Sequence, residues 1–329
     1  MKTLQLNNLT STSFEAWLVE AAQTPASRLC VTCSGYEQRS THWMRIVGDS
    51  LAKAGTARFF PIGFEDYTDC LSRPDNDEFY RSRGCEIYAC GSSRDDQFQT
   101  AFEAVLQETI ATAQGIPVEV HIDYSCMPRR WYCAIPTLVE GILRKTDRAF
   151  FWYSPGDYPK TEYPTAGTSD FCVFSGRPSL SCVSRTHLFG LGFDRIRSQA
   201  IWSVLDPSNL ICFYADPAAA EAYVERVRSD NREVIAASQH CFSVPLDDFY
   251  RALSKIVSVV KQFRNAGDVI IVPDGPKPLI LASSLVPFIL YDSPGVVCFH
   301  VARRTGKDFT PVDVKARGNP LGFSFNGNL

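Results

Sequence analysis

The sequence VEVHIDYSCMPRRWYCAIPTLV, residues 118–139, decides the predicted fold. It begins with a short β-branched run, which is typical of a buried strand. A polar turn follows, and apolar residues then recur at helical spacing from Trp131 to Leu143. Strand, loop and helix in this order make half of a doubly wound α/β unit, in which ligands bind at the carboxyl ends of the strands. We therefore expect four residues to lie where a ligand binds or reacts: Asp123, Ser125, Arg129 and Arg130.

A second copy of this pattern occupies residues 268–285, DVIIVPDGPKPLILASSL. It again consists of an apolar strand, an Asp, a turn with Pro and a basic residue, and an apolar helix. Asp274 corresponds to Asp123, and Lys277 corresponds to Arg129. The match predicts a duplicated chain with two related sites.

Further matching segments support the duplication. The loop GYEQRS at 35–40 resembles GFDRIRS at 192–198, with one spacing that differs by a residue. The strand predicted at 57–62 corresponds to one predicted at 209–214. Because the matching features keep their order along both halves, the predicted fold class is α/β, with two Rossmann-like domains that have parallel-rich sheets and are related by internal duplication.

The domain organisation follows from where these patterns begin and end. An amphipathic helix among the first residues is expected to pack on the domain that follows it. A stretch rich in Pro and Gly separates the halves and is expected to be an inter-domain connection. The predicted parts are an N-terminal helix in 1–27, a first Rossmann-like domain in 28–160, an irregular connection in 161–187, a second Rossmann-like domain in 188–315 and a C-terminal tail in 316–329.

Composition and charge exclude several classes of protein. The net charge of -3 argues against a protein whose whole surface binds nucleic acid. The sequence shows no signal-peptide pattern and no apolar run of membrane-spanning length, so we expect a cytoplasmic protein with no membrane contact. The 12 cysteines are scattered, several of them within apolar runs, and are expected to be free thiols.

The sequence lacks the motifs of common cofactor and hydrolase sites. It has no GxGxxG, no Walker loop and no GxSxG elbow, so the usual dinucleotide, NTPase and hydrolase sites are not expected, and neither is a cofactor. Cys30 and Cys33 have the spacing of a redox or zinc pair, but no second pair completes a metal site.

Two arginines are candidate anion ligands. Arg39 and Arg197 lie where a helix is predicted to begin, and helix amides together with an arginine suit an anion such as phosphate. The alternative is a structural salt bridge, from Arg39 to Glu37 or from Arg197 to Asp194.

The repeated strand-turn pattern supplies a second set of candidates. Arg129 and Lys277 are expected to hold a phosphate. Asp123 and Asp274 are expected to bind a ribose hydroxyl or to fix the turn. The alternative is that each Asp caps its helix while the basic residue stays solvated. Ligand contact is favoured because the motif is repeated.

The turn DGPKP at 274–278 and the helix after it resemble the Gly-Thr-Lys-type turn and helix of CRISPR-associated Rossmann fold (CARF) domains. The paired arrangement is similar to the SAVED domain, which looks like two fused CARF units. Both families sense cyclic oligonucleotides made during antiphage defence. The first half departs from the pattern, with Ser-Cys-Met-Pro-Arg in place of the Gly-Thr-Lys turn. The resemblance implies ligand contact by Asp274, Gly275, Lys277, Ser125 and Arg129.

The sequence therefore predicts a sensor-like protein that binds a cyclic or other phosphate-bearing nucleotide, with an effector or partner protein on a separate chain. Enzyme activity is not expected, because the five His are dispersed and no carboxylates are paired in a motif. The alternatives are a nucleotide-cleaving enzyme that uses the same loops and a non-catalytic assembly subunit of a multi-protein complex. Fold alone does not choose among these.

Overall fold

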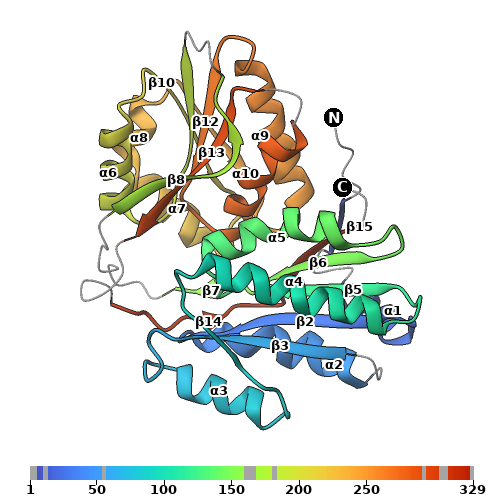
Figure 1. The fold of residues 1–329 in the computed structure, drawn as a ribbon. Coiled ribbons are helices and arrows are strands. Elements are labelled where there is room, and N and C mark those ends of the chain that lie inside the picture. Colours follow the sequence, from blue (N-terminus) through green and yellow to red (C-terminus); the bar gives the residue numbers. More distant parts are fainter. Residues whose placement is uncertain are drawn as a thin grey trace. The chain divides into compact units, whose positions relative to one another are not determined.

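The computed structural model describes residues 6–9, 14–53, 57–158, 168–179, 184–290, 294–303 and 310–326. These residues form two compact units. The N-terminal unit contains the described residues up to 158 together with 311–326, and the C-terminal unit contains those from 168 to 310. Each unit has its own large sheet (Figure 1).

The sheet of the N-terminal unit has seven strands in the order β1-β15-β6-β5-β2-β3-β4. Strands β6, β5, β2, β3 and β4 run parallel, whereas β15 is antiparallel to β6 and to β1. Its strands are β1 Leu6–Leu9, β2 Ser27–Ser34, β3 Ala57–Phe64, β4 Tyr88–Cys90, β5 Val118–Asp123, β6 Arg148–Tyr153 and β15 Leu321–Asn326, and a separate ribbon pairs β7 Gly156–Asp157 with β14 Lys315–Ala316. Its helices are α1 Phe14–Gln23, the 3-10 helix η1 Gln38–Thr41, the π-helix η2 Met44–Gly48, α2 Asp49–Lys53, α3 Arg73–Arg81, α4 Asp95–Thr112 and α5 Arg129–Ile142.

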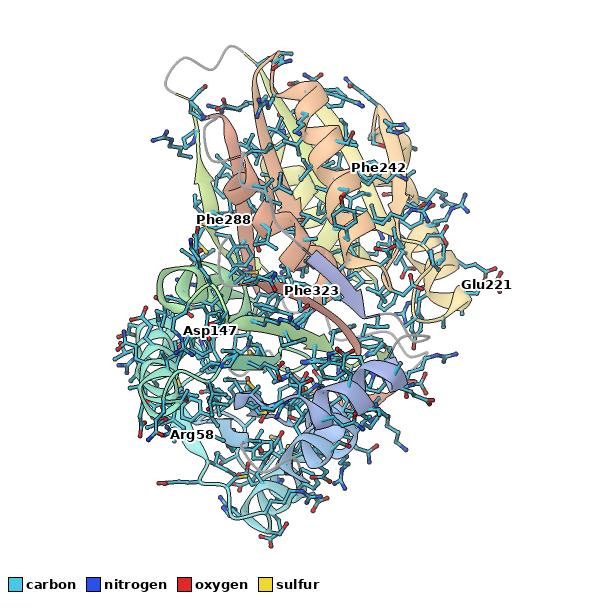
Figure 2. All side chains as sticks on the ribbon, turned by 90° about the vertical axis from the view of Figure 1, so that its right-hand side faces the viewer. Arg58, Asp147, Glu221, Phe242, Phe288 and Phe323 are labelled. Atoms are coloured by element: carbon cyan, nitrogen blue, oxygen red, sulfur yellow. The ribbon has the colours of Figure 1, made fainter. Side chains whose placement is uncertain are left out.

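Helices cover both faces of this sheet. Trp152 of β6 faces a core that it shares with α1, α2 and α3. Because alternate strand residues point to opposite faces, Phe151 points the other way, where its ring stacks on Phe323 of β15 at 5.2 Å between centroids (Figure 2 labels Phe323). Helices α4 and α5 lie side by side (Figure 1), and the rings of Phe98 and Trp131 stack between them at 4.5 Å.

The sheet of the C-terminal unit has six strands in the order β11-β10-β9-β12-β13-β8. All neighbouring pairs are parallel except β13 and β8. Its strands are β8 Thr168–Arg177, β9 Arg185–Gly190, β10 Asn209–Ala215, β11 His240–Val244, β12 Asp268–Pro273 and β13 Val296–Arg303. Its helices are α6 Arg195–Leu205, α7 Glu221–Asp230, α8 Arg232–Ala237, α9 Phe249–Phe263 and α10 Lys277–Ile289. Helices α6, α7 and α8 share one apolar core with the sheet, and α9 packs against α10.

The two units repeat one topology. When the parallel strands of each unit are numbered along the chain, both sheets have the order 3-2-1-4-5, with an antiparallel strand beside the fifth. This is the strand order of a Rossmann-like fold. The predicted fold class, with parallel-rich sheets related by internal duplication, is confirmed.

The antiparallel strand comes from a different part of the chain in each unit. Strand β15, which lies within the predicted tail at 316–329, pairs along β6 in the N-terminal unit. Strand β8, which lies within the predicted connection at 161–187, pairs along β13 in the C-terminal unit. Both segments cover the side of a buried parallel strand that would otherwise be an open sheet edge.

Candidate functional site

Both units have a topological switch point between their first and fourth parallel strands. It lies between β2 and β5 in the N-terminal unit and between β9 and β12 in the C-terminal unit. The chain leaves these neighbouring strands toward opposite faces of the sheet, and open α/β sheets bind ligands in the crevice at this point. Every site residue predicted from the sequence lies at the end of one of these strands, in the loop after it or in the helix that follows.

The loop after β2 is held by its own residues and by α3. The Ser40 hydroxyl donates to the carbonyl of Cys33 at 2.5 Å and accepts from the amide of Gly35 at 2.8 Å. The side-chain amide of Asn76 donates to the carbonyls of Gly35 and Glu37, each at 2.9 Å. The protein itself therefore fixes the course of this loop.

Arg39 is buried in this loop, with 2% of its surface exposed. Its Nε lies 2.5 Å from the Glu37 carboxylate, and its Nη1 donates to the carbonyl of Ser154, just after β6, at 3.0 Å. The rings of Tyr153 and Tyr158 each lie 5.6 Å from the guanidinium. Burial alone lowers the pKa of Arg39, but Glu37 and the tyrosines raise it above its ordinary value, so the side chain is charged. The ion pair with Glu37 is the arrangement observed, and phosphate contact by Arg39 remains a prediction.

Asp123 and Ser125 connect the end of β5 to the residue after β6. The Asp123 carboxylate accepts hydrogen bonds from the amide of Ser125 at 3.1 Å and from its hydroxyl. The Ser125 hydroxyl accepts a hydrogen bond from the amide of Ser154 at 2.7 Å. Asp123 thus fixes the turn, and its contact with a ribose hydroxyl remains a prediction, as does a ligand contact by Ser125.

Arg197 has the same place in the C-terminal unit as Arg39 in the N-terminal unit. Its Nε lies 3.0 Å from Oδ1 of Asp274 across the switch point, and its Nη2 donates to the carbonyl of Val301 on β13 at 2.5 Å. Asp194 caps α6 by accepting from the backbone amide of Arg197 at 3.0 Å. Each arginine therefore connects the segment after the first strand to the backbone near the end of the fifth strand. For Arg197 the backbone partner is on β13, and for Arg39 it is the residue directly after β6. Ligand contact by Arg197 and Asp274 remains a prediction.

An asparagine contact, not predicted from the sequence, recurs in both units. The side-chain amide of Asn231, directly after α7, donates to the carbonyl of Gly192 at 2.8 Å. Asn76 makes the same bond to Gly35. Asn76 lies within α3 whereas Asn231 directly follows α7, so no local sequence pattern indicates this equivalence. It shows that the first loop of each unit is held from the same side by the same chemistry.

Glycines allow the two loops of the C-terminal switch point to approach closely. A Cβ on Gly192 would lie 2.9 Å from the carbonyl oxygen of Asp274. A Cβ on Gly275 would lie 2.8 Å from the carbonyl oxygen of Leu191. A side chain at either position would require the backbone to move. Gly275 therefore has a packing role, and its predicted ligand contact remains a prediction.

Arg129 and Lys277 occupy equivalent positions. Each is the first residue of the helix that follows the fourth strand, and each is preceded by a proline N-cap, Pro128 or Pro276. Both side chains are partly exposed. The first amides of a helix have no partner within it and carry partial positive charge, to which a basic residue adds. An anion would be stabilised at either position.

Burial shifts the pKa of several ionisable side chains near these loops. His121 of β5 lies among aromatic rings on the face that α1 covers, and burial lowers its pKa. Burial also raises the pKa of Tyr80, Tyr124 and Tyr158 well above the ordinary value, so these phenols stay protonated.

Within the described part of the chain, no group of three His, Cys, Asp or Glu side chains could hold a metal ion. None of the described helices is both long enough and apolar enough to cross a bilayer.

A pocket of about 550 Å³ opens in the N-terminal unit at the carboxyl ends of β3 and β4. Its lining includes the ion pair between Arg73 and Asp77 of α3, in which Nε and Oδ1 are 2.7 Å apart and both residues are buried. Asp77 also accepts from the hydroxyl of Ser34, the last residue of β2, at 2.5 Å. Glu65, the residue directly after β3, lies on the pocket wall. The sequence predictions missed this pocket, although an acidic residue directly after the second strand could have indicated it.

No protein-family model and no curated protein matches the chain. Among solved structures, phosphoethanolamine N-methyltransferase 1 of Haemonchus contortus, in complex with phosphoethanolamine and S-adenosylhomocysteine, is 9% identical, with a TM-score of 0.23 over 97% of this chain and 92% of that chain. An adenylation, ketoreductase and pseudo-Asub multidomain structure of a keto acid-selecting NRPS module is 8% identical, with a TM-score of 0.21 over 90% of this chain and 34% of that chain. The fold assignment rests on the strand order of the two sheets and not on these similarities.

Proposed function

We propose that this chain is a sensor-like protein that binds a phosphate-bearing nucleotide at the carboxyl ends of its parallel strands. The observation that carries the proposal is the equivalence of Arg129 and Lys277. Each is the first residue of the helix after the fourth strand, and the switch point of its sheet lies beside that strand. A phosphate at either place would meet both helix amides and a side-chain cation.

The buried arginines support this proposal indirectly. Arg39 and Arg197 tie the loop after the first strand to the end region of the fifth strand, and Asp123 fixes the turn before α5. Loops that the protein holds in place lose little entropy when a ligand binds, which favours affinity.

The resemblance of the turn at 274–278 to CARF and SAVED sensors makes a cyclic oligonucleotide the first ligand to test. With such a ligand, the protein would act in the cytoplasm as part of antiphage defence. In this proposal the effector is a separate protein that responds to the bound chain.

Isothermal titration with cyclic di-AMP, cyclic di-GMP and the four ribonucleoside triphosphates tests the proposal. Arg129→Glu and Lys277→Glu should each weaken the binding of the ligand that the wild type takes by about 10-fold or more, because each removes a charge-assisted contact to phosphate. Arg148→Glu is the matched control, since Arg148 is exposed at the amino end of β6, away from the strand ends that hold the loops.

Each rival function gives a different result in this experiment. The ligand should be recovered intact after incubation, and cleavage would favour the nucleotide-cleaving enzyme. Equal affinity in all three variants and the wild type would refute the phosphate site. Absence of binding together with a stoichiometric protein partner would favour the assembly subunit.

A further inference from the structure

The pocket at the ends of β3 and β4 lies next to the switch point of the N-terminal unit. Phe64, the last residue of β3, lines the pocket, and its ring lies 5.7 Å from that of Trp131 in the first turn of α5. Phe64 also touches the loop after β2, because its Cε2 is 3.3 Å from where a Cβ on Gly35 would be. The pocket therefore adjoins both the helix start that carries Arg129 and the loop after the first strand.

The charges in the pocket do not suit a phosphate. Its lining carries three carboxylates and two guanidinium groups, for a formal net charge of -1, from Glu65, Asp69, Asp77, Arg73 and Arg81. Arg73 is already neutralised by Asp77 at 2.7 Å, and Arg81 lies 3.7 Å from the same carboxylate. A phosphate would meet a net negative wall here, whereas the nearby start of α5 is positive.

The Glu65 carboxylate is available to a ligand. Among the residues that the structure describes, none forms a hydrogen bond or an ion pair with it, although Asp66 beside it accepts from the Ser92 hydroxyl at 2.6 Å. The backbone amide of Glu65 donates to the carbonyl of Cys90 at 3.3 Å, which places the residue between the ends of β3 and β4. One carboxylate oxygen lies 3.3 Å from where a Cβ on Gly91 would be, so the side chain reaches over the loop after β4.

Most of the remaining lining residues are apolar, and Thr68 is the polar residue among them. Pro74, Ile87 and Ala89 line the pocket together with Phe64. A volume of about 550 Å³ falls within the range of roughly 300–1,000 Å³ that small-molecule sites have. A free carboxylate beside apolar walls suits a ligand that has hydroxyl donors at one end and a flat apolar body at the other.

We propose that this pocket holds the nucleoside part of the ligand, with Glu65 accepting hydrogen bonds from ribose hydroxyls and the base lying against Ile87 and Ala89. The proposal rests on the proposed function, because it assigns the phosphates to the start of α5. A carboxylate accepts hydrogen bonds at both oxygens and donates none, so it pairs with hydroxyl donors and repels phosphate. An acid after the second strand meets ribose in the same way in other Rossmann-like folds.

Glu65→Gln tests the assignment, and Glu86→Gln is its control. Glu65 and Glu86 are both exposed and near the pocket, but Glu86 does not line it. Because neither carboxylate has an ion pair in the described part of the chain, both variants should unfold in urea at the wild-type midpoint. Each protein is titrated with the four ribonucleoside triphosphates, cyclic di-AMP and cyclic di-GMP, with the 2′-deoxy form of each probe that binds, and with tripolyphosphate.

Glu65→Gln should weaken ribonucleotide binding by about 10- to 100-fold, as expected when a charge-assisted hydrogen bond is lost. The effect on the 2′-deoxy forms should be smaller, tripolyphosphate should bind as before, and Glu86→Gln should match the wild type. If Glu65→Gln binds ribonucleotides like the wild type while Arg129→Glu does not, the nucleoside pocket is refuted and the phosphate site stands. If no probe binds the wild type, both are refuted.

Discussion

Arg197→Met is the sharpest test of the structural role that the buried arginines have. The side chain of Arg197 is fully buried, its partner Asp274 is nearly so, and the two are 3.0 Å apart. Removing one member of such a pair costs about 3–5 kcal/mol, because the other charge stays buried. The lost hydrogen bond to the carbonyl of Val301 adds about 1 kcal/mol.

These losses are large for one folding unit, whose total stability is about 5–15 kcal/mol. With a urea dependence of about 2 kcal/mol per molar, the combined loss of about 4–6 kcal/mol lowers the unfolding midpoint of the C-terminal unit by about 2–3 M. The assay is urea unfolding followed by hydrogen exchange of β9 and β12, which reports the C-terminal unit separately from the N-terminal one.

Arg195→Met is the matched control. Arg195 is on the same helix and pairs with Glu233 at 3.0 Å, but both side chains are about half exposed. An exposed pair contributes about 0–1 kcal/mol, so this midpoint should move by less than about 0.5 M. Adding Asp274→Asn to Arg197→Met should recover part of the loss, because the buried negative charge is removed. Equal midpoints for Arg197→Met and Arg195→Met would refute the structural role of Arg197.

Two further predictions concern stability. Burial lowers the pKa of His121, so below the ordinary pKa of 6.5 the unfolded chain binds a proton that the folded N-terminal unit excludes. The free energy of unfolding of this unit should fall as the pH falls from about 7 to about 5, and His121→Leu should make this pH dependence weaker in urea titrations. An unchanged pH dependence in His121→Leu would assign the loss of stability to other groups. Asn76→Ala and Asn231→Ala should each cost about 1–3 kcal/mol in their own unit, because each removes a buried donor from the first loop. A loss confined to one of the two variants, measured by urea unfolding, would contradict their equivalence.

The sequence predicted the elements around each switch point closely. The strand and helix predicted within 118–143 are β5 and α5, and those predicted in the matching segment that begins at 268 are β12 and α10. This succeeded because each segment carries a strong local pattern, an apolar run and then helical periodicity, which burial in a parallel sheet enforces.

Features that depend on partners distant in the sequence were not predictable in the same way. Nothing local indicates that β15 pairs with β6, because strand pairing is decided by tertiary packing. The residue types at Arg39 and Arg197 fit an anion site and a buried ion pair equally well. Their placement against the carbonyls of Ser154 and Val301 appears only once the fifth strand is in position.

The pocket was missed for the same reason. Its walls come from β3, α3 and β4, which converge only in the folded unit. The equivalence of Asn76 and Asn231 was missed because Asn76 lies within α3 whereas Asn231 directly follows α7, so the two residues have different places relative to their helices.

The central claim is that a phosphate-bearing nucleotide binds at the strand ends beside Arg129. Mass spectrometry of the small molecules released when the purified native protein is denatured tests it most directly, with Arg129→Glu and Arg148→Glu prepared in parallel. The account predicts a nucleotide from the wild type and from Arg148→Glu, and little or none from Arg129→Glu. Recovery of the same nucleotide in equal amount from all three proteins, or of no nucleotide from the wild type, would contradict it.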